Sequence, residues 1–159
     1  MMLLQLQLYG LAFLIGSLTV ASLSDIRRMA AQKDFAEVWA GFTVLFLLYD
    51  VYHLDQLNPT MVAAKWMLIA FFAVASAKLT TQWFVLSLMD IAAVTAVMSL
   101  LTAKYVLIYY FIIIVAKEVL NPILKKFGDA GAYPFLPVVL TSTIIIFTTL
   151  NYGNTIITI

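Results

Sequence analysis

The chain has 159 residues, of which 64% are hydrophobic and only 11% are charged, whereas about 25% of an ordinary soluble domain is charged. This excludes a soluble globular domain, because so short a chain has too little interior to bury that much apolar surface. Lys and Arg number 9 against 8 Asp and Glu, so no basic surface for nucleic acid is expected. The absence of cysteine and the single histidine exclude thiolate and multi-histidine metal sites within the chain.

Six long apolar runs follow one another along the chain, separated by short polar segments. They cover residues 3–24, 35–52, 61–77, 83–101, 105–119 and 131–150. A helix needs about 20 apolar residues to cross a bilayer. The sequence therefore predicts an all-α, polytopic membrane protein, in which six transmembrane helices form one membrane-embedded domain surrounded by lipid, with no soluble domain.

Positive charge is distributed unevenly between the two ends of these runs. Seven Lys and Arg residues fall on one side: Arg27, Arg28, Lys33, Lys78, Lys117, Lys125 and Lys126. Two, Lys65 and Lys104, fall on the other. Because cytoplasmic segments are enriched in Lys and Arg, the first side is predicted to be cytoplasmic. Both termini then lie outside, and the protein is predicted to be a multi-pass protein of the cell membrane.

The first run ends in an acidic residue, Asp25, on the predicted cytoplasmic side. An interfacial charge cluster with Arg27 and Arg28 is one interpretation of this residue. Gly10 and Gly16 lie in the same run, and small residues of this kind allow helices to pack closely in membranes. The first helix is therefore expected to approach a neighbour along this face.

The second run ends in a small polar cluster, Asp50, His53 and Asp55. Asp50 and His53 are three residues apart, on one face of a helix, and carboxylate and imidazole groups bind Zn or Cu. A complete metal site would need ligands from another chain, because the sequence has a single histidine. A polar loop is the simpler interpretation, so neither a metal nor any other cofactor is expected.

The fourth run contains Asp90, seven residues after Trp83, which corresponds to about 10 Å below the cytoplasmic surface. A carboxylate in the middle of a bilayer costs about 2.5–3.5 kcal/mol on insertion scales, so such a residue is a candidate functional group. Together with Asp25 it would form a pair that shares one proton. One carboxylate then takes a proton from water, while the other donates a hydrogen bond to a scissile carbonyl. A buried polar anchor is the alternative interpretation of Asp90.

The last two runs are separated by a second acidic motif, Gly128-Asp129. Pro122 is expected to end the fifth helix, because proline disfavours a helical residue before it. Gly128 and Gly131 are expected to end a helix, and Asp129 to cap the next one. This interpretation is favoured over a catalytic role for Asp129.

Three segments resemble the archaeal preflagellin and type IV prepilin peptidases. The run Ser24-Asp25-Ile26-Arg27-Arg28, followed by Asp34 and Trp39, is similar to the segment around the first catalytic aspartate of that family. Asp90 follows Asp25 by 65 residues, a position similar to that of the second catalytic aspartate of the family. There the family has Gly-x-Gly-Asp, and this chain has Ser87-Leu88-Met89-Asp90. Near the end, Pro134-Phe135-Leu136-Pro137 resembles a Pro-Phe-x-Pro segment that often opens the last helix.

The resemblance implies a membrane-embedded aspartic endopeptidase with Asp25 and Asp90 as its catalytic pair. Its partner would be a pilin-like precursor, from which it removes the leader peptide at the cytoplasmic face of the membrane. Asp34 and Glu37 would attract the basic leader. Two alternatives remain: a non-catalytic subunit that binds other membrane subunits in a larger complex, and a small transporter with Asp90 as its proton or cation site.

Overall fold

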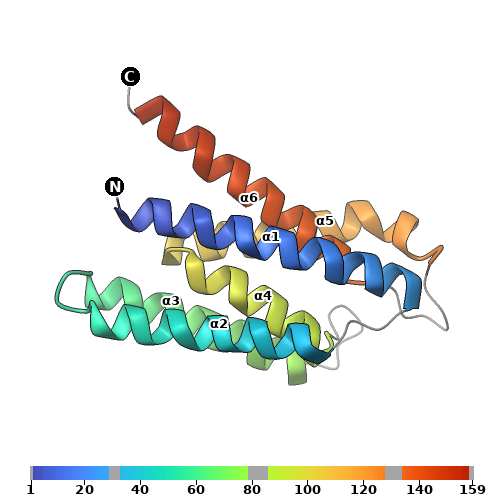
Figure 1. Ribbon diagram of the computed structural model, residues 1–159, viewed down its shortest axis with the longest axis horizontal. Coiled ribbons are helices and arrows are strands. Elements are labelled where there is room, and N and C mark those ends of the chain that lie inside the picture. Colours follow the sequence, from blue (N-terminus) through green and yellow to red (C-terminus); the bar gives the residue numbers. More distant parts are fainter. Residues whose placement is uncertain (1, 29–32, 79–85, 128–133, 158–159) are drawn as a thin grey trace. The chain divides into compact units, whose positions relative to one another are not determined.

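In the computed structural model, the described part of the chain consists of helices and their connections. The structure describes residues 2–28, 33–78, 86–127 and 134–157. The helices are α1 (Met2–Arg28), α2 (Lys33–Tyr52), α3 (Pro59–Lys78), α4 (Leu88–Leu100), α5 (Ala103–Leu124) and α6 (Leu136–Ile157) (Figure 1). These ranges contain no strand. The prediction of an all-α chain is confirmed, and each apolar run overlaps one helix.

Four of these helices are long and apolar enough to cross a membrane. The stretches are Gln5–Ile26, Asp34–Tyr52, Pro59–Ser76 and Ala103–Leu124, whereas α4 and the Leu136–Tyr152 part of α6 are apolar but shorter. Large apolar side chains project outward from them, with Leu45, Met67 and Phe71 being 65%, 67% and 72% exposed. Apolar surface of this extent suits lipid rather than water, as expected for a membrane protein.

Several helix boundaries differ from the predicted ones, and two of them concern Asp90 and Pro122. The fourth helix begins at Leu88, and Leu86 and Ser87 before it are not helical; Trp83 lies outside the described residues. With 13 residues, α4 is about 20 Å long and shorter than the hydrocarbon core of a typical bilayer. The fifth helix continues through Pro122, because a proline this close to a helix end disrupts only the final turn.

The helices group into two compact units, of which the first contains α1, α6 and most of α5. It comprises Met1–Ala30 and Tyr109–Ile159. Within it α1 packs against α6 (Figure 1). Each helix contributes a buried stripe at three- and four-residue spacing, which is the spacing of one helix face. The stripes are Leu11, Leu14, Leu18 and Ala21 on α1, and Leu136, Val139, Thr143, Ile146 and Leu150 on α6.

The expectation that Gly16 marks a close approach of α1 to a neighbour is wrong. Gly16 is exposed, and a Cβ placed on it would meet nothing within 4 Å. The buried face of α1 is formed by Leu11, Leu14, Leu18 and Ala21 instead. In a membrane, helices associate through van der Waals packing of such side chains.

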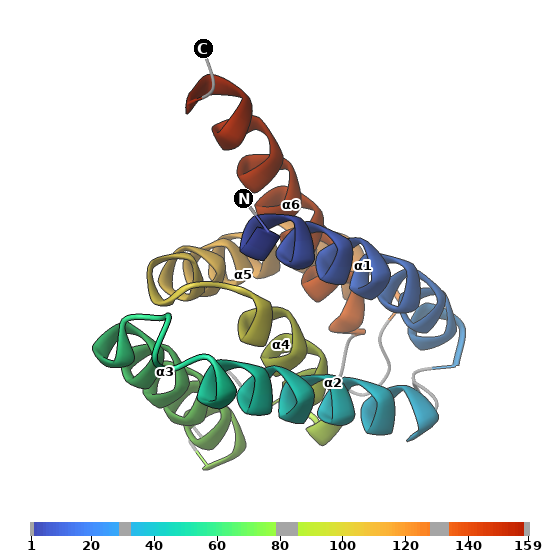
Figure 2. The same cartoon turned by 60° about the vertical axis from the view of Figure 1, so that its left-hand side comes forward.

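The second unit, Ala31–Ile108, contains α2, α3, α4 and the first residues of α5. The helices α2 and α3 diverge from a short turn, and α4 packs against both (Figure 2). Nearly all of α4 from Ala93 to Leu100 is buried. This explains why its sequence is apolar on every side, because a helix enclosed by others has no polar face.

The turn before α3 is built from two residues with strong local preferences. The Asn58 side chain accepts a hydrogen bond from the Thr60 N–H through Oδ1 at 3.1 Å, and Pro59 is the first residue of the helix. Asn before a helix and Pro at its first position are both favoured, because Asn satisfies an unpaired N–H and Pro has none to lose. The turn therefore holds the end of α2 beside the start of α3.

Candidate functional site

Asp25, the first candidate catalytic residue, lies in the last turn of α1 and contacts the start of α6. Its Oδ2 accepts a hydrogen bond from the backbone N–H of Leu136 at 3.3 Å, and the backbone N–H of Phe135 is a second donor to the carboxyl group. Asp25 is half-buried, whereas Phe135 and Leu136 are buried. The side chains of Arg27 and Arg28 lie outside the described residues, so the charge-cluster interpretation stays a prediction.

The sequence at the start of α6 explains why a carboxylate binds there. The first N–H groups of a helix have no acceptor within the helix. Pro137 has no N–H, and Val138 and Val139 donate to the Phe135 carbonyl at 2.9 and 3.3 Å. The Leu136 N–H therefore needs an acceptor from another element, and Asp25 supplies it. The carboxylate also complements the partial positive charge of the helix N-terminus.

Asp90, the second candidate, is the third residue of α4 and forms a capping box with Ser87. Its Oδ2 accepts hydrogen bonds from the Ser87 N–H at 3.1 Å and from the Ser87 hydroxyl at 2.7 Å. In return the Asp90 N–H donates to Ser87 Oγ at 3.2 Å. The predicted position within the helix is thereby corrected: Asp90 lies in the first turn of α4, not seven residues inside a helix.

Asp25 and Asp90 belong to different units, the first and the second respectively. Within its own unit each carboxylate lies at the N-terminal end of a helix and accepts a backbone N–H there. Asp25 reaches α6 from another helix, whereas Asp90 caps the helix to which it belongs. The two candidates therefore share one local feature, a carboxyl group at the N-terminal end of a helix, where the partial positive charge of the helix lies.

Asp34 and Glu37, the residues expected to attract a basic leader, lie in the first turns of α2 and are exposed. They are three residues apart and so share one helix face. Trp39, which also contributes to the resemblance, is fully buried and stacks on Phe35 with ring centroids 5.7 Å apart. The aromatic pair anchors the start of α2 and leaves the two acidic residues at the surface.

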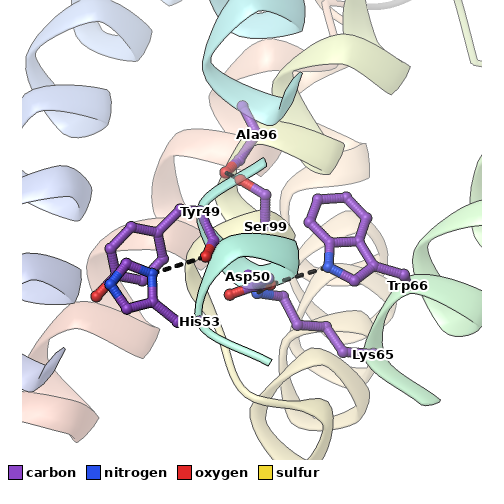
Figure 3. Close-up of polar contacts among 7 residues, drawn as sticks. All are labelled: Tyr49, Asp50, His53, Lys65, Trp66, Ala96 and Ser99. Carbon is purple, nitrogen blue, oxygen red and sulfur yellow. Dashed lines mark hydrogen bonds and ion pairs between the residues drawn. The ribbon is translucent and has the colours of Figure 1, made fainter. Parts of the chain in front are cut away.

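A buried ion pair that the sequence analysis missed lies near the other end of α2. Lys65 Nζ donates to Asp50 Oδ2 at 2.6 Å, and Trp66 Nε1 donates to the same oxygen at 2.9 Å (Figure 3). Asp50 and Lys65 are both only 7% exposed. Lys65 also lies over the Trp66 ring, 5.2 Å from its centroid. Ser99 of α4 is fully buried and donates to the Ala96 carbonyl at 2.7 Å, within its own helix.

The sequence analysis assigned Lys65 to the side opposite the seven-residue cluster, within the third apolar run, and the structure has it within α3. It follows Pro59 by six residues, or about 9 Å along the helix. Its long side chain can extend back toward the helix end, where Asp50 lies. The sequence contained a signal for this ion pair. Asp50 and Lys65 carry opposite charges on the two sides of a short turn, and such residues face each other when the helices fold back as a hairpin.

Of the other polar residues of this region, His53 has local partners. His53 Nδ1 lies 2.9 Å from the Tyr49 carbonyl oxygen, and the two rings are in contact, with centroids 4.2 Å apart and planes tilted by 32°. Asp55 is exposed. Among the residues that the structure describes, no three His, Cys, Asp or Glu side chains are grouped so that they could hold a metal ion. Asp129 lies outside the described residues.

A second buried polar contact, between Tyr109 of α5 and Thr143 of α6, was also missed. The two hydroxyl oxygens are 3.1 Å apart, and both residues are fully buried. Thr143 donates its one hydroxyl proton to the Val139 carbonyl at 2.7 Å. The Tyr109 hydroxyl is therefore the donor to Thr143. Single hydroxyl residues in apolar helices give no signal from which such a pair can be predicted.

Comparison with known proteins found no protein-family model, no curated protein and no solved structure that matches this chain. The functional assignment therefore depends on the residues and contacts described above.

Proposed function

We propose that this chain is a multi-pass membrane aspartic peptidase of the prepilin and preflagellin peptidase type. Asp25 and Asp90 are its catalytic pair, and it removes the leader peptide from a pilin-like precursor at the cytoplasmic face of the membrane. In this proposal all six helices cross the membrane, α4 being the shortest of them, and both termini lie outside.

The contact between Asp25 and the start of α6 is the observation that supports this proposal most strongly. Two of the segments that separately resemble the peptidase family, 24–28 and 134–137, meet through the hydrogen bond from Leu136 to Asp25, across 111 residues of sequence. Segments that serve one site must lie together, whereas unrelated chance resemblances have no reason to. Asp90 adds support, because it lies at the start of the fourth helix, where the resemblance implies the second catalytic aspartate.

The proposed reaction needs two carboxyl groups and one water molecule. One carboxylate takes a proton from the water as its oxygen attacks the carbonyl carbon of the scissile peptide bond. The other carboxyl group is protonated and donates a hydrogen bond to the carbonyl oxygen. When the C–N bond of the tetrahedral intermediate breaks, the leaving amine takes the proton that the first carboxylate received from the water. Two carboxylates that share one proton can fill both roles.

A basic leader would be drawn to Asp34 and Glu37 in the first turns of α2. Asp34 and Glu37 are exposed on one face of that helix. Their charges attract Lys and Arg side chains over roughly 8–10 Å at physiological ionic strength. The contribution of these residues would therefore fall as salt is added, which distinguishes leader binding from the chemical step.

Cleavage of a pilin-like precursor by the purified protein in liposomes tests the proposal. We expect Asp25→Asn and Asp90→Asn each to reduce the cleavage rate by about 100-fold or more. Asp55→Asn is the matched control, because Asp55 is an exposed aspartate of the turn between α2 and α3, and it should cleave normally. If the Asp90→Asn variant cleaved at the wild-type rate, Asp90 would not be a catalytic residue. Failure of the wild-type chain to cleave would reject the peptidase, and a non-catalytic membrane subunit would be tested next.

Cysteine labelling tests the proposed topology, because the natural sequence contains no cysteine. Gln56→Cys lies between α2 and α3, and Lys126→Cys follows α5. A membrane-impermeant maleimide applied to intact cells should label the first, and should label the second only after permeabilisation. The opposite pattern would reverse the proposed orientation.

A further inference from the structure

Ser87 occupies the position at which the peptidase family has the first glycine of Gly-x-Gly-Asp. In this chain its side chain is engaged with the candidate catalytic residue itself. Its hydroxyl donates to Asp90 Oδ2 at 2.7 Å, and its backbone N–H donates to the same oxygen at 3.1 Å. A glycine could supply only the second of these bonds.

The pairing between Ser87 and Asp90 is reciprocal. The Asp90 N–H donates to Ser87 Oγ at 3.2 Å, so the serine oxygen accepts one hydrogen bond and donates another. The serine hydroxyl has one proton, and that proton is directed to the carboxylate. Ser87 is exposed and Asp90 half-exposed, so the pair is accessible from outside the helix bundle. The carboxylate is therefore both held in place and within reach of a reactant.

We propose that Ser87 is the positioning residue of Asp90 and holds its carboxylate in the orientation required for catalysis. This inference rests on the proposed peptidase function. A charge-assisted hydrogen bond from a hydroxyl restricts the carboxylate to one rotamer, and catalytic groups lose rate when they are loosely held. In this chain a side chain supplies the restraint at a position where the family has no side chain.

An ordinary helix cap is the alternative role of Ser87, and glycine separates the two roles. At an N-cap, glycine costs only a few tenths of a kcal/mol relative to serine, whereas alanine costs about 1 kcal/mol. If Ser87 only caps α4, Ser87→Gly should behave like the wild-type protein. If Ser87 positions Asp90, Ser87→Gly and Ser87→Ala should both be impaired, and Ser87→Thr should be close to normal because threonine keeps the hydroxyl.

The kinetic experiment measures kcat and KM for leader cleavage with the wild-type protein and these three variants. We expect Ser87→Gly and Ser87→Ala to lower kcat by about tenfold or more, the effect of losing one hydrogen bond to a charged group, with KM nearly unchanged. Ser87→Thr should restore most of kcat. A wild-type kcat in Ser87→Gly would overturn the inference and leave Ser87 as a helix cap.

A second readout does not depend on peptidase activity. Carbodiimide and an amine modify accessible carboxyl groups, and mass spectrometry measures the modified fraction of Asp90. We expect faster modification in Ser87→Gly and Ser87→Ala than in the wild-type protein and Ser87→Thr, because Asp90 is then no longer held by the hydroxyl. Equal rates in all four proteins would overturn the inference. If the wild-type protein cleaves no leader, the proposed function fails, and this labelling alone decides whether Ser87 holds Asp90.

Discussion

Asp50 of α2 and Lys65 of α3 form an ion pair, 2.6 Å between Oδ2 and Nζ, that is almost completely buried. Trp66 donates to the same carboxylate oxygen at 2.9 Å. Charged groups remain at such positions only when they are paired and hydrogen-bonded, because an unpaired buried charge is very costly. The cluster therefore specifies which residues of α2 and α3 face each other next to their turn.

Removal of one partner of this ion pair should be strongly destabilising. We expect Asp50→Ala or Lys65→Ala to lower the free energy of unfolding by about 3–5 kcal/mol, because each leaves the other charge buried and unpaired. The double variant Asp50→Leu with Lys65→Met should be close to the wild-type protein, since it removes both charges. Unfolding in mixed detergent micelles measures all three. A double variant that loses the sum of the two single losses would contradict this explanation.

The Trp66 indole should contribute through its N–H rather than through its ring. Trp66→Phe keeps an aromatic ring but removes one donor to a charged acceptor, so we expect a loss of about 1.5–3 kcal/mol in the free energy of unfolding. The same substitution in the Asp50→Leu, Lys65→Met background should cost much less, because the acceptor is then absent. The same unfolding assay provides this double-mutant comparison. Equal losses in the two backgrounds would assign the effect to packing of the ring.

The contact between Asp25 and α6 should affect stability independently of catalysis. Asp25→Ala leaves the Leu136 N–H without its acceptor and should cost about 0.5–2 kcal/mol, as the loss of a helix cap does. Asp25→Asn keeps an acceptor oxygen and should cost less, while cleavage should be lost in both variants. Thermal unfolding in detergent, measured beside the cleavage assay, separates the two effects. An Asp25→Ala protein with the wild-type unfolding temperature would show that this hydrogen bond contributes nothing to stability.

The two members of the Tyr109–Thr143 pair should respond differently to removal. Tyr109→Phe removes the donor and leaves the Thr143 hydroxyl bonded to Val139, so we expect a loss of about 0.5–1.5 kcal/mol. Thr143→Val leaves a buried tyrosine hydroxyl without its acceptor and should cost more, about 1–3 kcal/mol. Thr143→Ser is the control and should stay closer to the wild-type value. A larger loss in Tyr109→Phe than in Thr143→Val would mean that the hydroxyl of Thr143, not that of Tyr109, is the donor.

The helical class could be predicted from the sequence because it depends on local properties. A helix satisfies its backbone hydrogen bonds within one segment, so the length and apolarity of each run were sufficient to locate it. The beginning of α4 was misplaced because the run continues without interruption through Leu86, Ser87 and Leu88. Only the hydrogen bonds between Ser87 and Asp90 show where the helix begins.

The partners of the acidic residues depended on the packing of helices. The sequence was enough to show that Asp25 lies at the end of one helix and that Asp50 and Lys65 flank one turn. The donor to Asp25 is 111 residues away, and Asp50 meets Lys65 through the folding back of α3. Which side chains meet is set by how far each helix is rotated about its axis and where it crosses its neighbour. The rotation and the crossing point of each helix are set by contacts between whole helix faces, so they cannot be predicted from any short stretch of sequence.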